Sequence, residues 1–281
     1  MRRLPGFRGH RGRTEQWRPP LRRARPPRAR PVELPFTDDD VVVAVKPPPL
    51  QGVGLDDEGG WGGVPIEEAV AASLRTASPS LRLIDPLDDA VSGVCILARN
   101  REAAADLVRQ IREHTYQRTY LAIVRGAPTE AQGTIELAIG PDRKDPEQMR
   151  IGGPHARDAV TEWTLRDRFA SFALLECRVG RERRHQVRLH LQAAGLPLAV
   201  DSRYGGGGML LLSAFKADYH ASRRHDERPL IARVSLHSSA VQFNHPRTGA
   251  GCVFEAEPAR DFRAALRQLD KYGRLPAGPM G

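Results

Sequence analysis

The sequence predicts an α+β fold, with a mixed, largely antiparallel central β-sheet flanked by helices. Two observations carry this prediction. Many short apolar or alternating segments are bounded by turn residues, and a few segments with helical periodicity are interleaved among them. The 281 residues, 40% of them hydrophobic, are enough to form a core without disulfides or metals. We expect one folded domain over residues 34–275, preceded by an arm at 1–33 and followed by a short tail at 276–281.

The strand predictions rest on β-branched, apolar or alternating runs that end at turn residues. Ordered structure is expected to begin near Val41, in a run that ends at Lys46 and three prolines. The predicted strands are Val41–Val45, Ser92–Ala98, Thr119–Val124, Gly133–Ile139, Ala159–Leu165 and Ser171–Val179.

Four helices are predicted from apolar spacing and end signals. Asn100 is a suitable cap for the second helix, whose apolar residues Ala104, Leu107, Val108 and Ile111 follow at three-and-four spacing. The Gly-rich, acidic segment Gln51–Gly63 is expected to be a loop. The other three helices are Pro65–Ala77, His185–Ala194 with Gly195 behind it, and a last helix that opens at Glu257 and Pro258 and stops at Gly273.

The net charge of +9 comes from the first residues of the chain. Residues 1–30 hold 11 of the 43 basic residues and one of the 34 acidic residues, so the other 251 residues are almost neutral. Prolines and arginines at this density predict a disordered basic arm. Such an arm is either a solubilising tail or a sequence-independent contact to phosphates. An organelle transit peptide is a weaker alternative, because prolines interrupt the segment and serine is absent from it.

The remaining composition predicts a cytoplasmic protein without a membrane anchor. Cys95, Cys177 and Cys252 show no metal-binding or paired spacing, which is typical of reduced thiols. No apolar run is long enough to cross a bilayer. His185 and His190 are five residues apart and do not share a helix face, so no metal site is expected there.

Two segments offer groups for chemistry, although each has a structural alternative. Asp88 and Asp89 precede Ser92-Gly93 at the entrance of a strand, where a turn can hold a carboxylate at the rim of the sheet. Such residues also commonly bond only their own turn. Tyr120 follows Arg118 on a strand, where an aromatic ring can stack on a base or simply be half buried.

A third segment concentrates arginines where a strand passes into a helix. Arg181, Arg183, Arg184 and Arg188 surround His185 and Gln186. Arginine forks match phosphate and carboxylate groups, so this segment predicts an anion clamp or, alternatively, a solvated helix start. The four glycines at Gly205–Gly208 lack the residues of a nucleotide-binding P-loop.

In this order, these segments resemble the motifs of the RluA/RsuA-type pseudouridine synthases, in particular the RluA type. The resemblance extends from about Val41 to Glu257. It rests on Val45-Lys46-Pro47, Leu87-Asp88 with Ser92-Gly93, Arg118-Thr119-Tyr120 through Gly126, Ala159-Val160-Thr161, Arg183 with His185-Gln186-Val187-Arg188 and His190, Gly195 with Pro197, Asp201 and Tyr204-Gly205, and Leu236-His237 with His245-Pro246. The chain departs from the pattern at Asp85-Pro86, where the family has His-Arg, at Ala90-Val91, where it has Asp-Thr, and at Glu182-Arg183-Arg184, where it has Gly-Arg-Thr.

The resemblance implies an enzyme that isomerises uridine in a loop of ribosomal or transfer RNA, as a monomer and without a cofactor. It assigns catalysis to Asp88, assisted by Tyr120, which is expected to stack on the uracil and to serve as acid or base. Arg183 is the first choice, and Arg188 the second, for the arginine that keeps Asp88 ionised. Arg118, Arg184, His185, Gln186 and Arg188 are expected to bind the substrate. The alternatives are an RNA-binding or ribosome-assembly protein on the same fold with a silenced site, and a hydrolase acting on nucleosides or sugars through Asp88 and Asp89.

Overall fold

One large sheet organises the chain. The computed structural model describes residues 32–48, 65–75, 81–145, 147–220 and 226–274; most of the predicted basic arm, the segment Gln51–Gly63 and the C-terminal tail lie outside them. Ten strands form the sheet in the order β1-β2-β4-β11-β5-β10-β9-β6, with β3 paired to β4 and β12 to β11. Their bounds are β1 Glu33–Thr37, β2 Val41–Lys46, β3 Arg82–Leu83, β4 Ser92–Ala98, β5 Gln117–Arg125, β6 Gln132–Glu136, β9 Val160–Arg168, β10 Phe172–Val179, β11 Leu236–Asn244 and β12 Gly251–Glu255.

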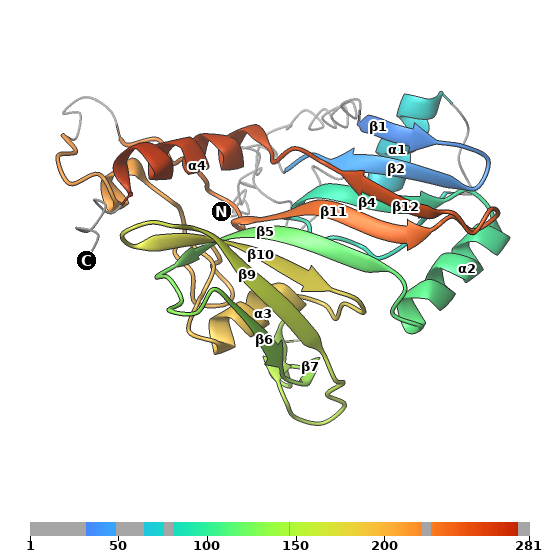
Figure 1. Ribbon diagram of the computed structural model, residues 1–281, viewed down its shortest axis with the longest axis horizontal. Coiled ribbons are helices and arrows are strands. Elements are labelled where there is room, and N and C mark those ends of the chain that lie inside the picture. The colour runs from blue at the N-terminus through green and yellow to red at the C-terminus, as the bar shows by residue number, and fades with distance from the viewer. Residues whose placement is uncertain (1–31, 49–64, 76–80, 146, 221–225, 275–281) are drawn as a thin grey trace, which may run out of the picture.

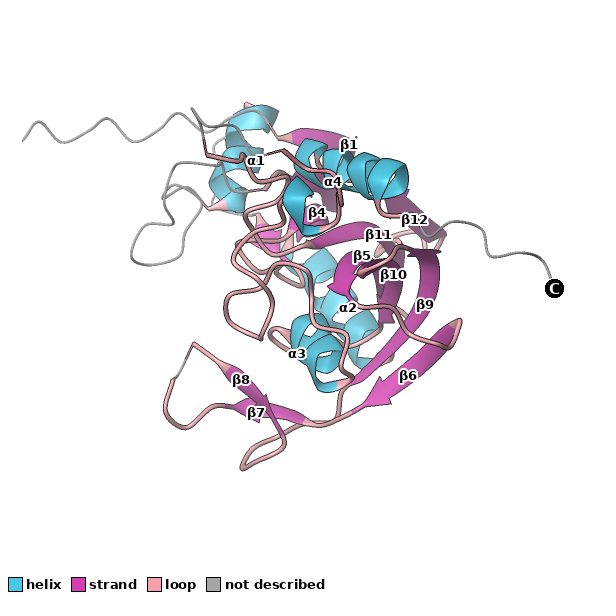
Figure 2. Cartoon of the chain, turned by 90° about the vertical axis from the view of Figure 1, so that its left-hand side faces the viewer, coloured by secondary structure: helices cyan, strands magenta, loops and turns pink. Residues whose placement is uncertain are grey.

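The predicted fold class is confirmed. Among the described strands, only β4 and β11 pair in parallel, and every other pair is antiparallel. Among the described residues, the first strand begins at Glu33, earlier than the expected Val41, because β1 pairs along β2. A small second sheet, β7 (Ile139–Pro141) with β8 (Met149–Ile151), projects from the body beyond β6 (Figure 2).

The helices cover both faces of the sheet. They are α1 Ile66–Leu74, α2 Arg101–Arg112, α3 Gln186–Ala193 and α4 Arg260–Tyr272, with a short 3-10 turn at Leu212–Ala214. As predicted, Asn100 caps α2 by accepting a hydrogen bond from the Ala103 backbone N–H, and Gly273 ends α4. Figure 1 shows α3 and α4 on opposite sides of the β5–β10 part of the sheet. Among the described residues, no helix is long and apolar enough to cross a membrane.

Alternation along the strands divides the core between the two faces. On β4, Cys95 and Leu97 point to the face covered by α1 and α3, and Val94 and Ile96 to the face covered by α2. On β10, Leu175 packs on the α3 side and Leu174 on the α4 side. Because side chains alternate at every residue of a strand, the register of the sheet decides which residues face α3. The residues of the candidate site lie on the face of the sheet that α3 covers.

A glycine determines how closely β4 and β11 approach. Gly93 has a φ of 122°, and a Cβ atom on it would lie 2.0 Å from the carbonyl oxygen of Ser238 in β11. The backbones therefore meet more closely than any side chain permits. The contact lies directly after the 84–91 turn that carries Asp88, so it also fixes where that turn leaves the sheet.

We expect Gly93→Ala to lower the free energy of unfolding by about 1–3 kcal/mol more than Gly126→Ala, because only the former adds overpacking to an unfavourable φ. Gly126 is the matched control: its φ is 74°, and a Cβ atom there meets nothing within 4 Å. Urea unfolding of both variants measures the difference. Equal losses of stability would show that β11 can move away from β4.

Candidate active site

The turn before β4 is held by a buried lysine. Lys46, the last residue of β2, donates from Nζ to the carbonyl oxygens of Asp88 at 3.3 Å, Asp89 at 2.7 Å and Val91 at 2.6 Å. Burial lowers the pKa of Lys46 to about 7, although the nearby carboxylates of Asp89 and Asp88 oppose this shift. An ammonium group that donates to these three backbone carbonyls fixes the chain from Asp88 to Val91.

The Asp88 carboxylate is paired with an arginine of α3. Its Oδ2 accepts a hydrogen bond from Nη1 of Arg188 at 2.8 Å, while 20% of the Asp88 side chain stays exposed. Arg188 also donates from Nε and Nη2 to the two oxygens of Asp201, at 2.7 and 2.9 Å. Burial favours the neutral acid at Asp201, but the bonds from Arg188 outweigh it and lower the pKa of Asp201. The guanidinium therefore bridges two carboxylates in a fixed orientation.

A histidine and a tyrosine flank this ion pair. The Tyr204 hydroxyl accepts from the Met149 backbone N–H at 2.9 Å and lies 2.7 Å from Nδ1 of His185, with which it shares a hydrogen bond. Burial lowers the pKa of His185 to about 4, so the ring is neutral near pH 7. Its Nε2 lies 3.8 Å from Asp88 Oδ1, beyond hydrogen-bond distance.

The predicted arginine clamp is divided among several partners. Arg183, the first choice for the partner of Asp88, instead donates from Nε and Nη2 to the Asp158 carbonyl oxygen at 3.2 and 3.1 Å, so the second choice, Arg188, is the observed ion pair. Arg183 lies in the turn before α3, and its backbone N–H donates to Oε1 of Gln186. The Arg183 side chain extends towards Asp158, just before β9. Arg184 pairs with Glu147 in the segment before β8.

Two of the expected substrate-binding residues are engaged inside the protein. Gln186 is fully buried and donates to the Val160 carbonyl oxygen and to Thr161. Arg118 is also fully buried, with Nη2 3.0 Å from Asp85 Oδ2 and 2.7 Å from the Asp85 carbonyl oxygen. Neither side chain reaches a surface where RNA could touch it in this conformation.

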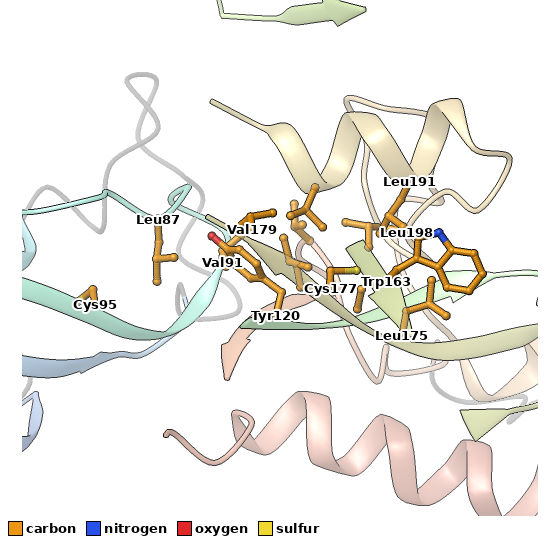
Figure 3. Close-up of a cluster of buried hydrophobic side chains, with 14 of the residues drawn as sticks. Leu87, Val91, Cys95, Tyr120, Trp163, Leu175, Cys177, Val179, Leu191 and Leu198 are labelled. Atoms are coloured by element: carbon orange, nitrogen blue, oxygen red, sulfur yellow. The ribbon is translucent and has the colours of Figure 1, made fainter. Parts of the chain in front are cut away.

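Arg118 is the centre of a buried polar cluster. Besides Asp85, its guanidinium contacts the hydroxyls of Tyr116 and Tyr120 at 3.2 and 3.3 Å, and Nη1 lies 3.8 Å from Glu182 Oε2. The Tyr120 hydroxyl donates to Glu182 at 2.7 Å. Only 2% of Tyr120 is exposed, and Figure 3 shows its ring next to Val91, in a cluster that includes Leu87.

Two departures from the family pattern introduce an acidic residue, and both acids lie in this cluster. Asp85 stands where the family pattern has histidine and Glu182 where it has glycine, and both carboxylates face the single cation of Arg118. Burial raises the pKa of Asp85, and burial together with the charge of Asp85 raises the pKa of Glu182 to about 8. Near neutral pH, Glu182 therefore holds a proton, and Asp85 is the carboxyl group closer to the Arg118 guanidinium.

The sequence does not assign contacts to several of these side chains. Lys46, Asp201 and Tyr204 lie within the family motifs, but the motifs do not say what these side chains bind. Asp85 and Glu182 stand out in the sequence only as departures from the family pattern. A buried arginine needs an acidic partner, so a buried Arg118 would have indicated its pairing with these acids. The sequence does not predict that Arg118 is buried.

Comparisons with known proteins identify the family of the chain. Residues 40–193 match the family model described as RNA pseudouridylate synthase. The chain belongs to that family.

Its relatives include an uncharacterized RNA pseudouridine synthase of Bacillus subtilis, YlyB, which is 32% identical over 191 residues, covering 68% of this chain and 56% of that protein. Ribosomal large subunit pseudouridine synthase C of Escherichia coli is 30% identical over 242 residues, covering 83% of this chain and 69% of the relative. The chloroplastic RNA pseudouridine synthase 2 of rice is 30% identical over 221 residues, and the alignment spans 75% of this chain but only 50% of the rice protein. The chain thus spans about half the length of some of these relatives.

Solved structures show the same fold. The human RNA pseudouridylate synthase domain containing 4 superposes with a TM-score of 0.60 at 19% identity, covering 84% of this chain and 92% of the human chain. The domain containing 1 protein gives a TM-score of 0.59 at 21% identity, covering 84% and 86%.

Replacing Arg188 should cost far more stability than replacing Arg183. Arg188→Gln leaves Asp201, which is 1% exposed, as a buried carboxylate without its cation, and we expect a loss of about 3–5 kcal/mol in the free energy of unfolding. Arg183→Gln removes contacts to one backbone carbonyl and should cost less than about 1.5 kcal/mol. Denaturant titration of both variants checks this order, and a reversed order would mean that Arg183 supports the carboxylates.

Glu182→Gln should change how stability depends on pH. Between the ordinary glutamate pKa of 4.5 and the folded pKa of about 8, the folded protein binds a proton that the unfolded chain has lost, so the wild type loses stability as pH rises. The glutamine variant lacks this term, and its free energy of unfolding should gain on the wild type by up to roughly 1.4 kcal/mol per pH unit in that interval. Parallel curves for the two proteins would show that Glu182 is ionised throughout.

Proposed function

We propose that the chain converts uridine to pseudouridine in structured RNA, with the Asp88 carboxylate as its catalytic group. The observation that carries the proposal is the setting of that carboxylate. It is partly exposed, Lys46 holds its backbone, and Arg188, which Asp201 orients, is its ion-pair partner. Membership of the RNA pseudouridylate synthase family supports the reaction.

The reaction needs a fixed carboxylate beside the ribose and no redox partner. The bond from N1 of uracil to C1′ of the ribose breaks, the base turns, and C5 bonds to C1′. C5 then loses its proton, and N1 gains one, so atoms and electrons balance without a cofactor. Asp88 can serve by attacking the sugar, by attacking the base, or by removing a proton from the sugar. Each of these routes requires the ionised carboxylate, and Oδ2 of Asp88 accepts a hydrogen bond from Nη1 of Arg188.

Tyr120 is the proposed partner of Asp88 for the proton on C5. Its hydroxyl donates to Glu182, so the step requires the ionised form of Glu182, which takes the hydroxyl proton while the phenol oxygen takes the proton from C5. The buried ring would have to become accessible when the base enters, and the turn 84–91, which packs on it through Leu87 and Val91, is the segment whose movement would uncover it.

The substrate class follows from the relatives. The Escherichia coli and Neisseria meningitidis proteins are named ribosomal large subunit pseudouridine synthases, which supports ribosomal RNA as the substrate, with transfer RNA as the alternative. The uridine must leave its stack to meet Asp88, which is easiest in a loop or bulge. We further propose that the protein acts as a monomer in the cytoplasm.

Asp88→Asn should reduce pseudouridine formation by at least about 10²-fold, the lower end of what a positioned proton-transfer group contributes, because the amide cannot act as a base or nucleophile. The protein and the variant are incubated with RNA from cells that lack this enzyme, and pseudouridine is mapped by base-specific chemistry.

Asp89→Asn is the matched control, since it makes the same change one residue along the same turn, and it should keep most of the activity. Full activity in Asp88→Asn would remove Asp88 from the mechanism. A wild type that binds RNA but modifies none would favour the RNA-binding protein with a silenced site.

A further inference from the structure

A basic pocket lies beside α3, on the side to which Arg183 points. Its volume is about 550 Å³, and its walls come from residues 156–160 at the start of β9, from Gly180, Arg181 and Arg183 after β10, and from His114 after α2. Three arginines line it, namely Arg157, Arg181 and Arg183, with Asp158 as the one acid among the lining residues. We call it the Arg157–Arg183 pocket.

The arginines of this pocket differ from the other functional arginines in their partners. Arg118, Arg184 and Arg188 each form an ion pair with a carboxylate. Within the described part of the chain, no carboxylate forms such a pair with Arg157, Arg181 or Arg183. Burial and the neighbouring charges of Arg181 and Arg157 lower the pKa of Arg183, which shows that the cations crowd one another.

Three arginines with the single acid Asp158 among the lining residues leave an excess of positive charge, which favours an anion as the ligand of the pocket. Arg183 uses Nε and Nη2 on the Asp158 carbonyl oxygen, which fixes its guanidinium and leaves its other N–H groups to donate. Arg157 and Arg181 are exposed, so their donors can turn towards the same ligand. Guanidinium forks match phosphate oxygens, and a partly fixed fork loses less entropy on binding.

We propose that the Arg157–Arg183 pocket binds the phosphodiester backbone of the RNA whose uridine enters the Asp88 site. This inference rests on the proposed function and adds a substrate contact to it.

The position of the pocket supports RNA as the occupant. Arg183 and Arg188 are five residues apart, so their Cα atoms are at most about 18 Å from each other. At roughly 3.4 Å per nucleotide, the rise of one strand in double-stranded DNA, the phosphates in reach belong to nucleotides within about five of the target uridine. The predicted anion clamp is therefore divided: Arg188 holds carboxylates, and Arg183 faces the pocket where the backbone would pass.

The test removes two charges from the pocket and two from a matched surface. The pocket variant is Arg157→Gln with Arg181→Gln, and the control is Arg166→Gln with Arg178→Gln, two exposed arginines of β9 and β10 that pair with Glu176. Binding of a uridine-rich stem-loop RNA to each full-length protein is followed by fluorescence anisotropy over a range of salt concentrations. Circular dichroism verifies that both variants are folded.

The pocket variant should bind more weakly than the control, and the slope of log K against log salt should become shallower by about 1.4, or roughly 0.7 for each lost contact to a single strand. The control should keep the wild-type slope. Equal slopes in the two variants overturn the inference, and if the wild type still forms pseudouridine, the proposed function stands without it. The opposite outcome is a shallower slope in the pocket variant alone, together with a wild type that forms no pseudouridine on any RNA. That outcome would support the phosphate contact and contradict the proposed activity.

Discussion

The site depends on one guanidinium group that is shared by two carboxylates. Arg188 donates two hydrogen bonds to Asp201 and one to Asp88, so the buried acid orients the arginine and the arginine orients the exposed acid. Neither carboxylate could be held so deeply alone, because a buried charge without a partner is costly. The surrounding structure serves this arrangement: β2 supplies Lys46 to hold the turn, and α3 supplies Arg188.

Arg118, another buried arginine near the site, has a different role. Arg118 balances Asp85 and the protonatable Glu182 behind Tyr120, at the two places where acids replace the residues of the family pattern. The loss of the family arginine at Pro86 is therefore accompanied by a new ion pair one residue earlier. Two departures that look unrelated in the sequence are one structural feature, since both acids face Arg118: Asp85 lies 3.0 Å from its guanidinium, and Glu182 accepts the hydrogen bond of the Tyr120 hydroxyl.

Strong local patterns predicted most elements, and tertiary contacts determined what they missed. Ser92–Ala98 was predicted with its observed bounds, because an uninterrupted apolar run leaves little choice. The central strand β11 was not predicted. Its polar residues His237 and Ser238 hide the alternation, and they are tolerated because Ser92, Val94 and Ala256 provide hydrogen-bond partners. The sequence also does not decide whether Arg183 or Arg188 pairs with Asp88, because both belong to the same motif. The path of the turn before α3 decides it, since this turn directs Arg183 to Asp158 and leaves Arg188 at Asp88.

The most direct test of the account is a crystal structure of the protein with an RNA that carries 5-fluorouridine at its modified position. Fluorine replaces the proton that C5 must lose, so the reaction should stop with the nucleotide in place. The account predicts the ribose of that nucleotide in contact with the Asp88 carboxylate, and Arg188 still joining Asp88 to Asp201. A fluorinated nucleotide bound away from Asp88, or Arg188 turned from both acids to a phosphate, would contradict it.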